Sequence, residues 1–143
     1  MLEQSDAKRA VEHIARAGGD VSIITYGSMV HAAQEAADKL AAEEGVEAEI
    51  IDLRSLQPLD KEAIFAAVRR TNRVVIVHEA NLTGGIGGEI AALISEHAFE
   101  ALDAPIKRVA GLDTPTPYAP VMEEFWRPNA DKIARAVQEV IRF

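Results

Sequence analysis

The stretch Arg73-Val74-Val75-Ile76-Val77-His78 sets four β-branched residues in a row and ends on a polar pair, His78-Glu79. An apolar run without polar alternation is typical of a strand buried on both faces. Such strands occur in parallel sheets that helices cover on both sides. The run therefore predicts the central strand of an α/β domain.

Segments of helical and β-strand character alternate on both sides of this run. Further β-branched segments lie at residues 21–26, 48–53 and 106–110, and segments with helical period lie at residues 30–44, 60–69, 86–99 and 129–142. Four alternations predict a three-layer αβα fold with a mostly parallel, open sheet of about five strands. Residues 13–17 suit either a short strand or a helical turn. Residues 113–120 contain three prolines, so we expect a loop there.

The length predicts one domain, which we expect to span residues 13–143 after a polar, frayed segment at residues 1–12. The formal net charge of −8 argues against nucleic acid as a partner, because phosphate binding favours a basic surface. No apolar run approaches the roughly 18 residues of a membrane span. The sequence has no cysteine and no apolar leader near Met1, and we expect a cytoplasmic location.

A glycine-rich loop follows the central strand and opens the helical segment at residues 86–99. Gly84, Gly85, Gly87 and Gly88 could present free N–H groups to an anion, or they could allow a neighbouring backbone or side chain to approach closely. The spacing matches neither the dinucleotide-binding fingerprint nor a phosphate-binding loop of the Gly-Lys-Ser/Thr type. The second interpretation is therefore favoured.

His78 and Glu79 are the most site-like pair in the sequence, since a histidine beside a carboxylate could transfer a proton. The alternative is a histidine that caps a strand or lies at an interface. No candidate nucleophile or oxyanion donor accompanies the pair, and no histidine spacing predicts a metal site. We therefore expect no catalytic and no metal-binding residue in this chain.

Six motifs occur in the order typical of one protein family. In that order they strongly resemble the C-terminal, transketolase-type domain of the β subunit of thiamine-diphosphate-dependent 2-oxo acid dehydrogenases, which act on pyruvate or branched-chain 2-oxo acids. The resemblance covers residues 13–143. The motifs are residues 20–30, Ile51-Asp52-Leu53-Arg54-Ser55-Leu56-Gln57-Pro58-Leu59-Asp60, Val77-His78-Glu79-Ala80, Thr83-Gly84-Gly85-Ile86-Gly87-Gly88-Glu89-Ile90, Leu102-Asp103-Ala104-Pro105 and Asp113-Thr114-Pro115-Thr116-Pro117-Tyr118.

The resemblance implies an assembly domain that is inactive by itself. In the family, thiamine diphosphate and Mg²⁺ lie between the α subunit and the N-terminal domain of the β subunit, so this domain alone is expected to bind no cofactor. Its implied partners are the α subunit, a second β subunit and the basic peripheral subunit-binding domain of the dihydrolipoyl acyltransferase.

The resemblance also implies contact residues. The acyltransferase would contact Asp103 and the terminal carboxylate of Phe143, with Glu100 one turn earlier. His78, Glu79 and the four loop glycines would then lie at subunit interfaces. Two other functions stay open: a free-standing domain that binds a small molecule or nucleotide, and the C-terminal domain of a transketolase or deoxyxylulose-phosphate synthase.

Overall fold

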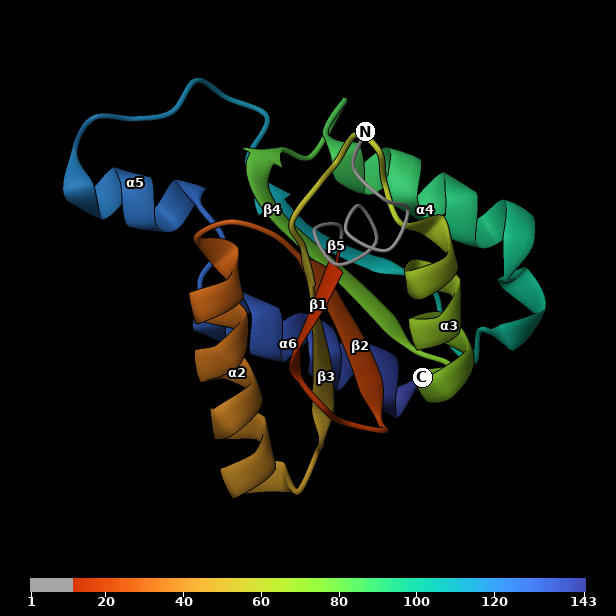
Figure 1. Ribbon diagram of the computed structural model, residues 1–143. Coiled ribbons are helices and arrows are strands. Elements are labelled where there is room, and N and C mark those ends of the chain that lie inside the picture. The colour runs from red at the N-terminus through yellow and green to blue at the C-terminus, as the bar shows by residue number, and fades with distance from the viewer. Residues whose placement is uncertain (1–11) are drawn as a thin grey trace.

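A five-stranded sheet forms the centre of the computed structural model, which describes residues 12–143 (Figure 1). The strands lie in the order β1-β3-β2-β4-β5, and all neighbours are parallel except the antiparallel pair of β1 and β3. Their bounds are β1 Glu12–Arg16, β2 Val21–Thr25, β3 Ala48–Leu53, β4 Val74–Asn81 and β5 Lys107–Gly111. The predicted sheet is confirmed, and the undecided residues 13–17 belong mostly to β1. The predicted segment 1–12 lies outside the described residues except for Glu12, and the domain boundary stays a prediction.

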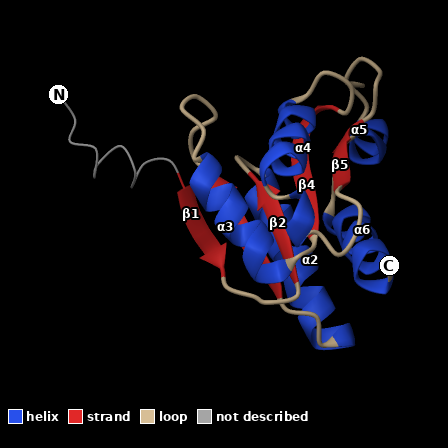
Figure 2. Cartoon of the chain, turned by 90° about the vertical axis from the view of Figure 1, so that its right-hand side faces the viewer, coloured by secondary structure: helices blue, strands red, loops and turns tan. Residues whose placement is uncertain are grey.

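Helices cover both faces of the sheet, which confirms the three-layer prediction. Residues of α2 and α6 share one apolar cluster with one face, and residues of α3 and α4 share another with the opposite face. Figure 2 shows β1 at one edge of the sheet and β5 at the other. The bounds of these helices are α2 Met29–Glu44, α3 Lys61–Thr71, α4 Ile86–His97 and α6 Ala130–Arg142.

The central strand β4 supplies both clusters. Residues 74–78 are all buried. Val75 and Val77 pack toward α2 and α6, whereas Val74 and Ile76 pack toward α3 and α4. Successive side chains of a strand point to opposite faces, so a run without polar residues joins the two halves of the core.

One helix was not predicted from the sequence. The loop after β5 ends at Ala119, and α5 (Pro120–Trp126) begins at the next residue (Figure 1). Proline suits the first position of a helix, because its missing N–H would be unbonded there anyway. Within α5 only Trp126 is buried, while Val121, Met122 and Phe125 are exposed. The other helices were predicted from an apolar stripe that faces the core, and α5 lacks such a stripe.

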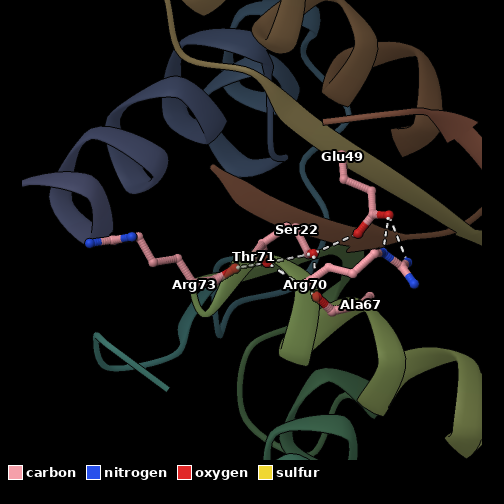
Figure 3. Close-up of polar contacts among 6 residues, drawn as sticks. All are labelled: Ser22, Glu49, Ala67, Arg70, Thr71 and Arg73. Carbon is pink, nitrogen blue, oxygen red and sulfur yellow. Dashed lines mark hydrogen bonds and ion pairs between the residues drawn. The ribbon is translucent and has the colours of Figure 1, made fainter. Parts of the chain in front are cut away.

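A buried polar cluster ties β2, β3 and α3 together near the amino ends of the parallel strands (Figure 3). The Ser22 hydroxyl donates to Glu49 Oε2 at 2.9 Å and lies 2.8 Å from the Thr71 hydroxyl oxygen. Arg70 donates from Nε and a terminal nitrogen to Glu49 Oε1, at 3.0 and 2.7 Å. Glu49 is only 3% exposed, so these donors replace the water that its carboxylate loses on folding.

We expect the change Arg70→Met to destabilise the fold, because it leaves the buried Glu49 carboxylate without its cation. Half-exposed Arg70 is partly screened by water, so the loss should be about 2 kcal/mol, below the 3–5 kcal/mol typical of a fully buried pair. Urea unfolding followed by circular dichroism measures it. The double variant Arg70→Met/Glu49→Gln should be more stable than the single variant, since it buries no unpaired charge. An Arg70→Met protein as stable as the parent would contradict this account.

Candidate docking surface and the carboxyl edge of the sheet

The order of the strands reverses between β2 and β4, and their carboxyl ends form the place where open α/β sheets usually bind ligands. The loop after β2 contains Gly27 and Ser28, and the glycine run spans the loop after β4 and the first turn of α4. His78 lies between these loops, and its ring centroid is 6.4 Å from that of Tyr26. The predicted glycines and His78 are therefore brought together.

The His78 ring lies inside the domain. The residue has no exposed surface, and Nδ1 lies 3.0 Å from the carbonyl oxygen of Ala80. The carbonyl can only accept, so Nδ1 carries the proton when the ring is neutral. No described residue bonds to Nε2. Burial lowers the pKa of His78, and nearby Arg108 lowers it further, against the opposing effect of the Ala80 carbonyl.

The glycines of the loop make room for this ring. A Cβ atom at Gly87 would lie 2.6 Å from His78 Nε2, and one at Gly85 would lie 2.6 Å from His78 Cε1 and 2.4 Å from the Asn81 carbonyl oxygen. Gly84 has a backbone φ of +77°, a conformation that residues with a side chain rarely adopt. Close approach therefore explains the glycine pattern.

The same loop does not fit a diphosphate or a nucleotide. The His78 ring fills the space beside Gly85 and Gly87. The N–H and the hydroxyl of Thr83 both donate to the carboxylate of Asp113, at 2.9 and 2.6 Å. These bonds lower the pKa of Asp113 and hold a negative charge at the mouth of the loop. A bound phosphate would face that charge, so the anion-site interpretation is not supported.

His78 and Glu79 do not form a proton-transfer pair. His78 is buried and Glu79 is exposed, since adjacent residues of a strand point to opposite sides. Among residues 12–143, no group of three or more potential ligand side chains could hold a metal ion. Gly87 is buried with His78, so these two residues shape the surface from below, whereas Glu79, Gly84, Gly85 and Gly88 reach it. Their place at a subunit interface stays a prediction.

Asp103 and Phe143, far apart in the sequence, line one apolar groove of about 470 Å³. We call it the docking groove. Phe99 and Phe143 are 69% and 80% exposed, so two aromatic side chains stand open to solvent beside an acidic one. Glu100 is exposed in the short 3₁₀ helix Phe99–Ala101 but is not among the lining residues. The lining residues are Ala91, Ser95, Phe99, Leu102, Asp103, Ala104, Pro105, Ile106 and Phe143.

Residues at the start of β4 hold this groove in place. The Asp103 N–H donates to the carbonyl oxygen of Asn72 at 2.8 Å, and its carboxylate lies 4.0 Å from an Arg73 terminal nitrogen. Arg73 Nε also donates to the Val140 carbonyl near the end of α6, at 3.1 Å. Arg73 therefore connects the Asp103 loop to the helix that carries Phe143.

Phe99 was not predicted as a contact residue, and Leu102 appeared only as the first residue of the Leu102-Asp103-Ala104-Pro105 motif. Phe99 ended a predicted helix at residues 86–99, whereas α4 ends at His97 and leaves Phe99 facing solvent. The one available signal was the position of both residues beside Glu100 and Asp103. A second exposed apolar surface, formed by Tyr118, Val121, Met122 and Phe125, was also missed.

The fold and these surfaces define an α/β domain whose described residues expose apolar side chains at the docking groove and at α5. The profile of the family described as "Transketolase, C-terminal domain" matches residues 11–133. The chain belongs to this family.

Relatives with assigned functions are β subunits of larger enzymes. The chain is 47% identical to the β subunit of 2-oxoisovalerate dehydrogenase from Bacillus subtilis over 91% of its own length, but it spans 40% of that protein. It is 45% identical to the β subunit of an acetoin:2,6-dichlorophenolindophenol oxidoreductase from the same organism, over 90% and 37% of the two chains. It is 47% identical to the mitochondrial pyruvate dehydrogenase β subunit of Saccharomyces cerevisiae, over 90% and 35%. The chain thus spans about two-fifths of these relatives.

Solved structures share the fold. A split-gene transketolase, described as an inactive β4 tetramer, has a TM-score of 0.81 and 31% identity, over 92% of this chain and 42% of its own. A transketolase from Pichia stipitis has a TM-score of 0.66 at 15% identity, over 100% of this chain and 20% of its own, and shows the fold alone. The predicted transketolase-type fold is confirmed.

The contact between Gly87 and His78 predicts a position-specific effect within α4. Gly87→Ala should destabilise the domain by about 1–3 kcal/mol, because the buried ring has no space to move away from the new methyl group. Gly88→Ala is the matched control: its methyl group would meet only the flexible end of Arg108 at 3.5 Å, and alanine favours helix. Thermal unfolding of both variants tests this, and equal melting temperatures would contradict it.

Burial of neutral His78 predicts loss of stability in mild acid. Its folded pKa is below the unfolded value of about 6.5, so above that pH the group contributes no pH dependence. As the pH falls below about 6.5, only the unfolded chain gains a proton, and stability declines by at most about 1.4 kcal/mol per pH unit until the folded pKa is reached. Urea unfolding between pH 7.5 and 5.5 measures the decline, and His78→Gln should reduce it. An NMR titration in which His78 protonates at or above pH 6.5 would contradict it.

Proposed function

We propose that this chain is the C-terminal assembly domain of the β subunit of a thiamine-diphosphate-dependent 2-oxo acid dehydrogenase and has no decarboxylase activity by itself. The observation that carries the proposal is the meeting of Asp103 and Phe143 in one exposed apolar groove. The relatives support it, because two of the three described above are 2-oxo acid dehydrogenase β subunits. The chain supplies surfaces for docking, and the remaining three-fifths of a β subunit would lie outside it.

In this proposal the cofactor belongs to the whole enzyme. Thiamine diphosphate supplies the carbanion chemistry of decarboxylation there, with Mg²⁺ on its diphosphate. The residues described above do not fit the group, because His78 fills the glycine loop and Asp113 holds a negative charge at its mouth. We therefore assign it to other parts of the enzyme.

Three partners follow from the proposal: the α subunit, a second β subunit and the peripheral subunit-binding domain of the dihydrolipoyl acyltransferase. The acyltransferase domain is basic in the family, and Asp103 with Glu100 gives the docking groove an acidic rim. Complementary charge speeds encounter and fixes orientation more than it adds affinity. Phe99 and Phe143 would then supply the apolar contact, which usually dominates binding energy.

The relatives do not identify which 2-oxo acid the whole enzyme would use. Two of them are named for 2-oxoisovalerate and pyruvate, and a third is named for acetoin, which is not an oxo acid. The split-gene transketolase favours a second candidate function, the corresponding domain of a transketolase. The third alternative, a free-standing nucleotide-binding domain, is disfavoured by the glycine loop. No helix of residues 12–143 is long and apolar enough to cross a membrane. The cytoplasmic location stays a prediction, since the relatives include bacterial and mitochondrial proteins.

The docking groove predicts that the chain binds a peripheral subunit-binding domain and that binding weakens with salt. Asp103→Asn should weaken it about two- to fivefold, as expected for one exposed ion pair, and Phe143→Ala about tenfold, as expected for an interface anchor. Isothermal titration at 50 and 300 mM NaCl measures this. The titration uses the dimeric or tetrameric species that light scattering identifies, because the family resemblance implies that the partner binds close to the twofold axis between two β subunits.

Glu35→Gln is the matched control, since it removes an exposed carboxylate on α2 that lines no part of the docking groove. It should bind like the parent. Parent-like binding by Asp103→Asn and Phe143→Ala would show that the partner docks elsewhere. An oligomer that does not bind the partner at either salt concentration would overturn the proposed function.

A further inference from the structure

The strand β5 ends the sheet, and no described strand pairs with its outer edge. Figure 2 shows β5 at this edge with α5 and α6 beside it. An edge strand presents unpaired N–H and C=O groups, which are a template for another extended chain. Natural edges are usually shortened, bulged or covered. β5 has five residues, and its pairing with β4 shifts register between Val77 and Asn81, near the carboxyl end of the pair.

A groove runs along this edge. All five residues of β5 line it, with Lys132, Arg135 and Ala136 of α6 on the other wall, and its volume is about 470 Å³. We call it the edge groove. Leu112, which also lines the groove, is held by α5: its N–H donates to the Trp126 carbonyl at 3.3 Å, and the Trp126 indole N–H donates to the Leu112 carbonyl at 3.0 Å. Because all five residues of β5 line the groove, it is long enough for a short extended segment.

The charge of the edge groove is opposite to that of the chain. Its cations are Lys107, Arg108, Lys132 and Arg135, and its acids are Asp113 and Glu139, whereas the whole chain carries −8. Lys107 is neutralised by Glu139 at 2.6 Å, and the Asp113 carboxylate is held by Thr83. Arg135 is exposed and has no ion pair or hydrogen bond with any described residue, and its nearest carboxylate interaction is a longer-range one with Asp131, one turn earlier in α6. A positive charge is thus left open on the α6 wall.

A second copy of this chain is the less suitable occupant. Two β5 edges related by a twofold axis would set two grooves against each other, each with more cations than acids. Like charges set opposite each other at an interface cost binding energy. An extended segment with carboxylates would instead meet Arg135 and Arg108 with opposite charge.

We propose that the outer edge of β5 and the facing wall of α6 form a binding site for an extended acidic peptide segment, which adds to the sheet as a sixth strand. Backbone hydrogen bonds to β5 supply the pairing, as in other cases of strand addition. Acidic side chains on the α6 side enter the groove and contact Arg135, whereas the side chains at alternate positions, which are small or apolar, point to the opposite face of the sheet. The site is separate from the docking groove, with which it shares no lining residue.

The test uses the 143-residue chain and a fluorescent nine-residue peptide of alternating Glu and Val. Anisotropy should show saturable binding that weakens between 50 and 300 mM NaCl. Two further peptides carry N-methyl groups on alternate residues, one for each edge of the strand. Because strand pairing uses one edge of the peptide, only one of the two should lose binding. A peptide of alternating Lys and Val should not bind.

The variant Arg135→Gln should weaken binding of the Glu-Val peptide up to about fivefold, as expected for one exposed charge contact. Arg54→Gln, which removes an exposed cation after β3 outside the edge groove, should leave binding unchanged. The proposal is overturned if the acidic peptide does not bind, if both N-methylated peptides bind like the parent peptide, or if Arg54→Gln weakens binding as much as Arg135→Gln. It is also overturned if light scattering and amide exchange show β5 paired with a second copy of the chain.

Discussion

Burial of β4 on both faces is the constraint on which the rest of this domain depends. Residues 74–77 present only apolar side chains to both layers, and His78 after them is also buried. The strand is therefore stable only with helices on both sides. The two apolar clusters meet across it, and β2 and β5 pair with its two edges. The positions of the glycine loop and of the Asp103 loop follow, since both are fixed to the ends of this strand.

The carboxyl end of β4 shows how a loop that resembles a ligand site serves packing instead. His78 brings a polar ring into the core, and Gly85 and Gly87 accept it at distances that no side chain tolerates. In many α/β proteins the equivalent place receives a ligand. Here the His78 ring occupies that space. The surfaces that we describe as candidate contact sites lie instead at the docking groove, the edge groove and α5.

The sequence predicted the elements whose side-chain pattern reports on the core, and it missed those stabilised by other contacts. Four strands and four helices have an apolar run or an apolar stripe, and each lies where expected within a few residues. The helix α5 has no such stripe, because Trp126 is its only buried side chain and polar contacts, such as those of Lys132 with the Glu124 and Phe125 carbonyls, hold the rest. For the candidate site, the resemblance supplied Asp103 and Phe143. The exposed ring of Phe99 depends on where α4 ends, which a local pattern does not fix.

The contacts of Arg73 have a consequence for recognition. Its backbone carbonyl accepts from the Ser22 N–H and from the Thr71 hydroxyl, a residue that Figure 3 shows beside it. Its side chain spans the Asp103 carboxylate and the Val140 carbonyl. One residue beside the first residue of β4 thus anchors both sides of the docking groove to the buried central strand. A surface preorganised in this way loses little conformational entropy when a partner arrives, so more of the contact energy is retained as affinity.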